Sequence, residues 1–245
     1  MTESLQLDQA RCLRSHGVTV PYDPAIITPP IAAALRAGCY EAEEAEQIPS
    51  IVEPGDVVVE IGAGIGFIST LVARQPCLAK VFAFEANPAL IPFMAKLHAQ
   101  NGVTGVERVN AVLCNTADTS ARFYQRRDFW MGSLAPGPEP YVAAISVPVI
   151  NLNDFLAREA VSLIICDIEG AEKWLFGDAD LASVNRIYVE LHDHITGLGG
   201  IAALFEHMGA RGFAYDPRHS CGAVVLFRRV AENEVLRAFS GKTDA

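Results

Sequence analysis

The chain has 245 residues, of which 51% are hydrophobic and 20% are charged, and its formal net charge is −10 at pH 7. This length suits one α/β domain with a small addition, and the apolar content is ample for a sizeable core. The negative charge argues against general nucleic-acid binding and against docking on anionic membranes, so we expect neither partner.

The six cysteines are scattered along the chain without a Cys-x-x-Cys pair. Several lie in apolar contexts, as Cys166 does, so we interpret them as reduced core residues of a cytoplasmic protein, not as disulfides or a zinc site. The first nine residues are polar and acidic, unlike a signal peptide, and no apolar run reaches membrane-spanning length.

Residues 1–53 are predicted to form an N-terminal cap of helices before a main domain over residues 54–245, the two making one globular unit. One helix is expected over residues 31–36, after Thr-Pro-Pro and before a glycine. A second is expected over residues 41–52, ended by Glu-Pro-Gly. Residues 17–21 suggest a short edge strand that ends at its proline.

Residues 56–70 predict a strand, a glycine turn and a helix. The first part is rich in β-branched residues, as in a strand buried on both faces of a parallel sheet. Gly62, Gly64 and Gly66 follow, and glycine lets the backbone turn sharply and approach a ligand. A dinucleotide site of the pattern Gly-x-Gly-x-x-Gly would need glycine where Phe67 stands. A tight turn without any ligand is the simpler alternative.

Glu85 ends a second predicted strand over residues 80–85. A carboxylate at this place can accept a hydrogen bond from each hydroxyl of a ribose, which favours an adenosyl ligand over a merely solvated acid. Asn87 and the proline after it predict a helix start, with Asn87 as the N-cap. A third strand is expected over residues 107–113, and Asn110 and Ala111 within it could lie against adenine.

Residues 120–150 interrupt the alternation of strands and helices and predict an inserted β-hairpin or flap. Trp130 and Met131 in its loop are candidates for covering a substrate. Tyr124 fits a core position of the hairpin better.

The second half of the chain completes the predicted sheet. Its strands are expected at residues 161–167, 185–191, 212–215 and 222–227, and its helices at residues 152–157, 171–177, 200–209 and 231–239. The last two strands are joined by only a turn, so they must be antiparallel. The result is a mostly parallel seven-stranded sheet whose last strand is reversed, whereas a dinucleotide-binding fold keeps its strands parallel.

Acidic residues gather where the fourth and fifth strands of this sheet end. Asp167, Glu169 and Glu172 follow the fourth strand, and Glu190 and His192 follow the fifth. Carboxylates also stabilise a helix start, so Glu169 and Glu172 have a structural alternative. Three acids at the edge of the sheet where ligands bind exceed what capping needs, and they suggest acid–base chemistry with His192.

These motifs resemble a known family. The acid, turn and glycine spacing from Glu60 to Gly66 is similar to motif I of the class I S-adenosylmethionine (SAM) methyltransferases. The run Asp-Ile-Glu-Gly-Ala-Glu at residues 167–172, with Glu-Leu-His at 190–192, resembles the FkbM family within that class. Further similar features span roughly residues 38–192: Gly38–Glu41, Phe84–Pro88, Asn110–Ala111 and Gly132–Ser133. Glu60 departs from the family, where many members carry Asp, as does Ala63-Gly64-Ile65, where many carry Ala-Asn-Ile.

The resemblance implies a Rossmann-like class I methyltransferase fold and SAM as the methyl donor. Members of the family are mostly O-methyltransferases of sugars, polyketides and other natural products, which implies a small hydroxylated substrate. In such enzymes the glycine turn passes under the methionine part of SAM, and the acid at Glu60 helps to hold its ammonium group. The implied cofactor-binding residues are Tyr40, Glu60, Gly62, Gly64, Glu85, Ala86, Asn87, Asn110, Ala111 and Asp167.

For catalysis, His192 is the preferred general base, with Asp167 or Glu169 orienting the substrate hydroxyl or the imidazole. A structural role for His192 is an alternative, as is a divalent metal, Mg²⁺ or Mn²⁺, held by Asp167, Glu169 and His192. We prefer the metal-free version, since acidic strand ends are common without metals. The rival functions are an NAD-dependent oxidoreductase and a SAM-binding module without catalysis.

Overall fold

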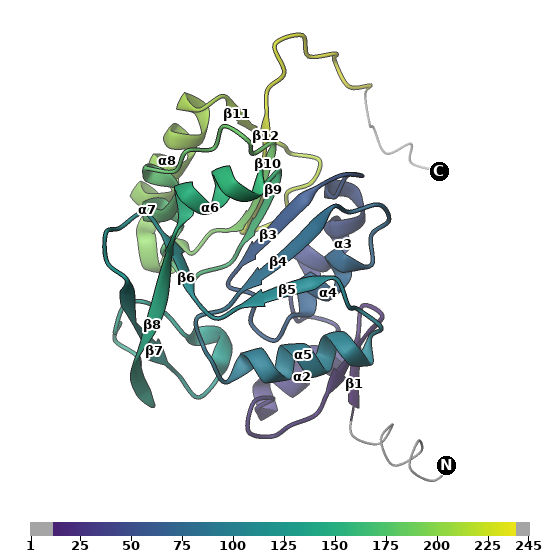
Figure 1. The fold of residues 1–245 in the computed structure, drawn as a ribbon, viewed down its shortest axis with the longest axis vertical. Coiled ribbons are helices and arrows are strands. Elements are labelled where there is room, and N and C mark those ends of the chain that lie inside the picture. The colour runs from purple at the N-terminus through teal and green to yellow at the C-terminus, as the bar shows by residue number, and fades with distance from the viewer. Residues whose placement is uncertain (1–11, 239–245) are drawn as a thin grey trace.

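A seven-stranded sheet forms the centre of the molecule (Figure 1). The computed structural model describes residues 12–238. The strand order across the sheet is β5 (Val106–Val109), β4 (Lys80–Phe84), β3 (Val57–Ile61), β9 (Leu163–Cys166), β10 (Arg186–Glu190), β12 (Val224–Arg229) and β11 (Phe213–Tyr215). Only β12 runs opposite to the other six strands. The predicted α/β class I methyltransferase fold, with its reversed last strand, is therefore confirmed.

Helices cover both faces of this sheet, because its strands are apolar on both sides. Along β3, Val58 packs into one core and Val59 into the other, and Ile165 and Ile164 of β9 do the same. The first core takes in α2 (Pro29–Ala37), α3 (Ala42–Ile51), α4 (Phe67–Ala73) and α5 (Leu90–Gln100). The second takes in α6 (Leu152–Glu159), α7 (Glu172–Gly177) and α8 (Asp193–Ala210).

The N-terminal cap contains a hairpin as well as the two predicted helices. Strand β1 (Cys12–Ser15) pairs with β2 (Val18–Pro21) in a separate two-stranded sheet. The short edge strand predicted at residues 17–21 is thus confirmed as β2, which ends at its proline, and its partner is β1 and not the central sheet. Val18 and Val20 are buried in the same core as α4 and α5, which holds the hairpin over these helices. The first nine residues lie outside the described part of the chain.

The inserted hairpin is confirmed, and the end of the predicted third strand pairs with it instead of with the central sheet. β7 (Ser120–Gln125) pairs antiparallel with β8 (Ala143–Asn151), and β6 (Val112–Cys114) pairs parallel with β8. A short 3₁₀ helix, η1 (Phe129–Met131), lies in the loop between β7 and β8. The strand predicted over residues 107–113 is therefore split. Asn110 causes the break, because its side chain donates hydrogen bonds to the backbone carbonyls of Glu85 and Ala86.

Helices α5 and α8 begin at residues other than those predicted. Helix α5 begins at Leu90, because the Asn87 side chain accepts a hydrogen bond from Ala89 N in the turn that precedes the helix. Helix α8 begins at Asp193, seven residues before its predicted start, and is kinked at Gly197.

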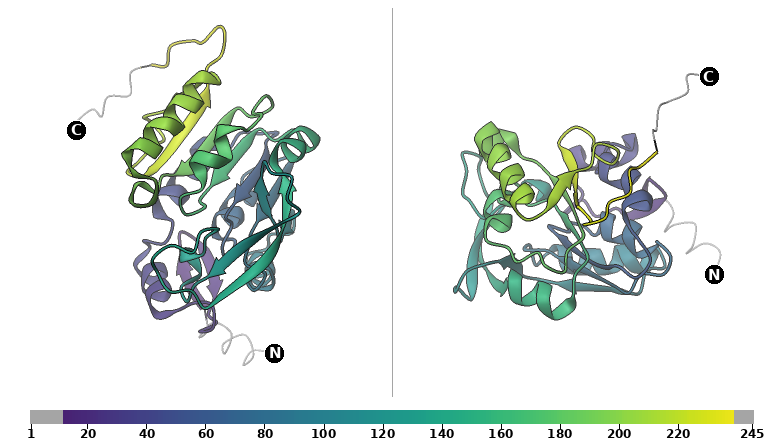
Figure 2. Two further views of the ribbon diagram at one scale, coloured as in Figure 1. Left: turned by 90° about the vertical axis from the view of Figure 1, so that its left-hand side faces the viewer. Right: turned by 90° about the horizontal axis from the view of Figure 1, so that it is seen from above.

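The predicted terminal helix is wrong for residues 231–238, which form a turn and an irregular segment outside the sheet (Figures 1 and 2). Val235 and Leu236 are 85% and 92% exposed, so this segment has no apolar face packed on the core that would stabilise a helix.

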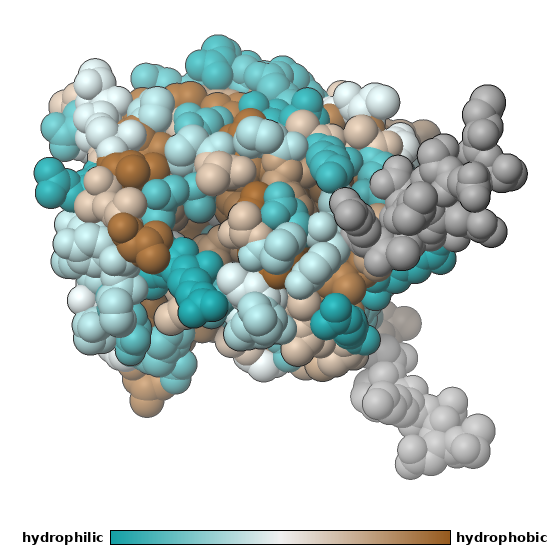
Figure 3. Space-filling view, turned by 90° about the horizontal axis from the view of Figure 1, so that it is seen from below, coloured by the Kyte–Doolittle hydropathy of each residue, from teal (hydrophilic) through white to brown (hydrophobic). Residues whose placement is uncertain are grey.

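The surface carries small apolar groups between hydrophilic ones, as Figure 3 shows for one face. Among the helices of residues 12–238, none is long and apolar enough to cross a membrane. The six cysteines all lie in this range and form no disulfide with one another.

Candidate active site

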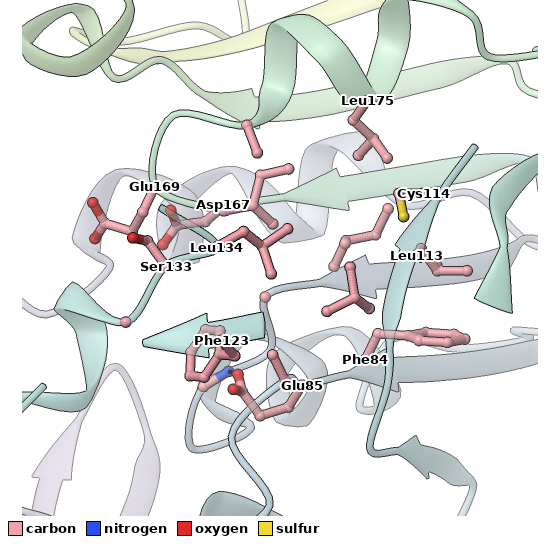
Figure 4. A pocket seen from close by; sticks show the side chains of 18 of the residues that line it. Phe84, Glu85, Leu113, Cys114, Phe123, Ser133, Leu134, Asp167, Glu169 and Leu175 are labelled. Carbon is pink, nitrogen blue, oxygen red and sulfur yellow. Dashed lines mark hydrogen bonds between the residues drawn. The ribbon is translucent and has the colours of Figure 1, made fainter. Parts of the chain in front are cut away.

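A cavity of about 390 Å³ opens at the carboxyl ends of β3, β4 and β9. In Figure 4, Asp167 and Glu169 lie at one end of it near Ser133 and Leu134, and Leu113, Cys114 and Leu175 lie at the other. Its volume is in the range of small-molecule sites, about 300–1,000 Å³. Of the residues predicted from the sequence, the wall includes Tyr40, Gly62, Gly64, Glu85, Ala86, Ala111, Asp167 and Glu169.

The glycine turn forms one wall of the cavity. Gly62, Gly64 and Gly66 have φ of +89°, +52° and +83°, the left-handed region that glycine adopts at little cost. A Cβ on Gly62 would lie 1.7 Å from the carbonyl oxygen of Asp167, so only glycine lets β3 approach the end of β9 this closely. A Cβ on Gly64 would point toward the Phe129 ring at 3.3 Å. The turn therefore keeps a strip of bare backbone against the cavity.

Glu85 lies beside this turn with both carboxylate oxygens engaged. Oε2 accepts a hydrogen bond from Gly64 N at 2.8 Å, and Oε1 accepts one from Asn87 N at 2.6 Å. Each oxygen keeps a further lone pair for a ligand hydroxyl. Burial raises the pKa of Glu85 to about 7, although these backbone N–H groups oppose the shift.

Three predicted cofactor residues are not on the wall of this cavity. Asn110 supports the Glu85 loop from behind, and the Asn87 amide oxygen accepts a hydrogen bond from the Gln125 side chain at 2.6 Å, which ties the insert to this loop. Glu60 is 5% exposed and faces a second, smaller cavity. Burial raises the pKa of Glu60 to about 8.

The acid end of the cavity centres on His192, which lies behind the wall. Its Nδ1 is 2.7 Å from Glu172 Oε1, and its Nε2 is 3.4 Å from Asp167 Oδ1 and 3.6 Å from Glu169 Oε2. His192 is buried, whereas Asp167 and Glu169 reach the cavity. Burial alone would lower the pKa of His192, but Glu172, Asp167 and Glu169 together raise it to about 9.

Burial raises the pKa of Asp167, and the nearby Glu190 adds to the shift. Burial also raises the pKa of Glu169. The Glu169 backbone is left-handed, with φ of +53°, and the next residue, Gly170, has no room for a Cβ against Ile195. A non-glycine residue in this conformation is strained, which is typical of functional sites. The strain turns the chain so that Glu169 reaches the same cavity as Asp167.

Aromatic side chains cover the cavity from the insert and the cap. The Tyr40 ring stacks on Trp130 with centroids 6.1 Å apart and meets Phe129 edge-on at 6.4 Å. All three line the cavity, as expected for Trp130. Met131 and Tyr124 do not line it, and Tyr124 packs on Tyr141 instead.

Sequence reasoning missed several wall residues. Glu41 was visible in the motif beside Tyr40, but its left-handed backbone, with φ of +46°, was not predicted. Cys114 and Trp174 come to the wall from β6 and α7, elements whose mutual position only the tertiary structure defines. No local pattern marks these two residues.

Residues 60–214, more than half of the chain, match the family described as Methyltransferase FkbM domain. None of the curated protein sequences matches the chain.

Among solved structures, the chain is similar to Trm5b from Pyrococcus abyssi, with 15% identity and a TM-score of 0.48 over 88% of this chain and 54% of that one. The chain thus spans about half the length of Trm5b. It is also similar to TYW2 from M. jannaschii in complex with AdoMet, with 14% identity and a TM-score of 0.48 over 89% and 86% of the two chains.

Proposed function

The chain belongs to the FkbM family of methyltransferases, and on this premise we propose that it methylates a hydroxyl group of a sugar or natural-product small molecule with SAM as donor. The observation that supports this function best is that one cavity joins the glycine turn and Glu85 to the carboxylates of Asp167 and Glu169. The first pair suits an adenosyl ligand, and the second suits a hydroxyl group that must lose a proton.

The residues on the wall fit SAM. Glu85 has lone pairs left for two ribose hydroxyls, and the turn through Gly62 and Gly64 leaves backbone bare where a Cβ would intrude. Tyr40 and Trp130 add aromatic faces, which attract a cation such as a sulfonium. When bound, SAM supplies a methyl group that is already activated on its positive sulfur.

The protein's own part is to hold the acceptor and to take its proton. We assign the proton to the carboxylate of Glu169 or Asp167, since both reach the cavity and His192 does not. Burial raises the pKa of both carboxyl groups, which makes them stronger bases than exposed acids. His192 acts through them: its Nε2 lies behind both and its ring is held by Glu172. The proposed general base is therefore one of these carboxylates and not His192, which we preferred from the sequence.

We further propose that the substrate is a small molecule, that neither nucleic acid nor an anionic membrane is a partner, and that the protein is cytoplasmic. The size of the cavity supports a small-molecule substrate, and the net charge of −10 continues to argue against nucleic acid and anionic membranes as partners. The absence of disulfides among the six cysteines is compatible with a cytoplasmic location.

Calorimetry with SAM, S-adenosylhomocysteine and NAD tests the cofactor. We expect the first two to bind and NAD not to bind, because Phe67 stands where a pyrophosphate-binding turn has glycine. Incubation with methyl-labelled SAM and a panel of hydroxylated sugars and natural products then tests the reaction. SAM binding without labelled product from any acceptor would favour a binding module, and preference for NAD would overturn the proposal.

Variants test the assignment of the base. Glu169→Gln and Asp167→Asn are expected to lower kcat by about 10²–10⁴, the usual contribution of a general base, and His192→Ala to lower it less. The matched control is Glu206→Gln, an exposed acid on α8 that does not line the cavity. Circular dichroism checks that the variants fold. Full turnover in both carboxylate variants would show that neither Glu169 nor Asp167 is the general base.

A further inference from the structure

A second cavity, of about 20 Å³, lies behind the glycine turn and shares Asp167 with the active-site cavity. Its wall carries five acids: Glu41, Glu44, Glu60, Asp167 and Glu190. A space of this size holds about one water-sized occupant. It is therefore too small for an organic ligand and suits a single ion.

Three potential ligands converge beside this cavity from the ends of β9 and β10. One ligand atom each of Asp167, Glu190 and His192 lies within 4.8 Å of the other two. Asp167 Oδ1 and His192 Nε2 are 3.4 Å apart. Neighbouring ligands around a small octahedral cation are about 3 Å apart, as bond lengths of about 2.1 Å require. The three groups thus lie near enough to share one cation once their side chains move closer together.

The imidazole is already oriented for this purpose. Glu172 is 2% exposed, and its Oε1 lies 2.7 Å from His192 Nδ1 and accepts a hydrogen bond from Gly170 N at 3.0 Å. With Nδ1 held by Glu172, Nε2 faces Asp167, and a cation bound there would take the place of the proton on Nε2. Histidines that bind metals are held in this way, with a carboxylate on the other ring nitrogen.

An independent observation comes from carboxylate oxygens that have no partner. Glu60 Oε2 and Asp167 Oδ1 are buried without any hydrogen bond. Glu60 is only 5% exposed and lines the small cavity. Within residues 12–238, no ion pair joins a lysine or arginine to any of the five acids; only His192 pairs with one of them. A buried carboxylate oxygen that has no hydrogen-bond donor is unfavourable, so these two oxygens favour a positive occupant of the cavity.

We propose that Asp167, Glu190 and His192 bind a divalent cation, Mg²⁺ or Mn²⁺, at the small cavity, with the free oxygen of Glu60 facing it. Hard oxygen ligands with one imidazole suit these ions. These ligands differ from the metal-binding set that the sequence suggested, because Glu190 takes the place of Glu169. Since Asp167 also lines the active-site cavity, the cation lies next to the acceptor. Its effect on catalysis rests on the proposed function, whereas its binding does not.

Direct binding of Mn²⁺ tests the site. The full-length protein is treated with EDTA, dialysed and titrated with MnCl₂, and free Mn²⁺ is followed by electron paramagnetic resonance. We expect one saturable site per chain. Glu190→Gln is expected to weaken it by at least about tenfold, and Glu172→Gln by about 10–100-fold, since supporting carboxylates have effects of this size. The matched control, Glu43→Gln, removes a charge near Glu190 that does not line the small cavity, and it should bind nearly as the wild type does.

A measurement on the wild type avoids dependence on variants that fold poorly. Pulsed electron paramagnetic resonance of bound Mn²⁺ should show coupling to one imidazole nitrogen, from His192. No saturable site, no nitrogen coupling, or unchanged binding in a folded Glu190→Gln variant would overturn the proposal.

Assays of methyl transfer, run beside the Mn²⁺ titration, test the cation site and the proposed function separately. Mn²⁺ binding without methyl transfer to any acceptor would keep the site and count against the function. Methyl transfer in a protein that binds no Mn²⁺ and resists chelation would keep the function and remove the site.

Discussion

Gly62 shows how one residue joins two strands at the active site. It has φ of +89°, and its missing Cβ leaves room for the carbonyl oxygen of Asp167. The same close approach brings the glycine turn, which suits the cofactor, next to the acid that ends β9. A single missing methyl group therefore links the proposed cofactor-binding turn to the carboxylates proposed for catalysis.

Gly62→Ala is expected to abolish SAM binding and to destabilise the fold by several kcal/mol, because a Cβ at 1.7 Å forces β3 and β9 apart. The control is Gly102→Ala, which also has positive φ, +69°, but no atom within 4 Å of its Cβ. It should cost about 1 kcal/mol, from backbone strain alone. Calorimetry with SAM and urea unfolding measure both variants. If both variants lost the same free energy of unfolding, backbone strain and not the close approach of Gly62 to Asp167 would explain the effect.

Glu85 should make SAM binding depend on pH. Its pKa is raised to about 7 by burial, and the ionised carboxylate is the better acceptor for ribose hydroxyls. As the pH falls from about 8 to about 6 the carboxylate is protonated, so the affinity should fall by about tenfold. Calorimetry at both pH values measures this. Glu85→Gln should bind more weakly at the higher pH and lose this part of the pH dependence; an unchanged pH profile in the variant would contradict the assignment.

Helices α4 and α5 pack through a buried polar contact below the glycine turn. His98 of α5 is fully buried, and its Nε2 lies 3.1 Å from Ser69 Oγ of α4. A Cβ on Gly66 would lie 2.8 Å from the same nitrogen. Burial, with a smaller contribution from the charge of Arg108, lowers the pKa of His98 to about 4. The two helices therefore hold this imidazole neutral.

The low pKa of His98 predicts a loss of stability in acid. The unfolded chain binds the proton at pH values below about 6.5, and the folded protein only near 4, so stability falls as the pH drops between these values. At about pH 5 the loss from this group is about 2 kcal/mol relative to about pH 7.5. Urea unfolding of wild type and His98→Gln at both pH values measures it. The variant should lack this part of the loss, and an identical pH dependence would refute the prediction.

At the scale of the whole molecule, the cap and the sheet share one core. Ile31 and Ile48 of the cap are buried in the same cluster as Val58 and Ile65 of the main domain. Arg186 reinforces the connection: it is 2% exposed, donates to Ile51 O at the end of α3, and lies 2.6 Å from the buried Asp56. We therefore propose that residues 12–53 and the sheet form one folding unit.

Arg186→Met is expected to lower the free energy of unfolding by about 3–5 kcal/mol, because it leaves Asp56 buried without its charge partner. Arg158→Met removes an exposed arginine paired with Glu159 and should cost less than about 1 kcal/mol. Urea unfolding followed by circular dichroism and by tryptophan fluorescence should give one coincident transition. Separate transitions would show that the cap and the main domain unfold independently.

Local patterns in the sequence are sufficient to predict the order of the strands and helices along the chain. Runs of β-branched residues mark strands apolar on both faces, and the short link before β12 requires a reversed strand whatever the rest of the fold does. The glycine turn and the acids at strand ends are also local, because strand ends in a parallel sheet meet at one edge. These features are enough to predict that Gly62, Glu85 and Asp167 share one cavity, as they do.

Tertiary structure decided which side chains face one another across that edge. His192 lies behind Asp167 and Glu169 because Glu172, from a different element, holds its ring. Glu190 rather than Glu169 completes the candidate cation site, since β10 pairs with β9 in a register that the sequence does not display. Distances between side chains on separate elements depend on packing, and packing sums contacts far apart in the chain. Sequence thus determined which edge carries the chemistry, and the fold decided how its acids are divided between two cavities.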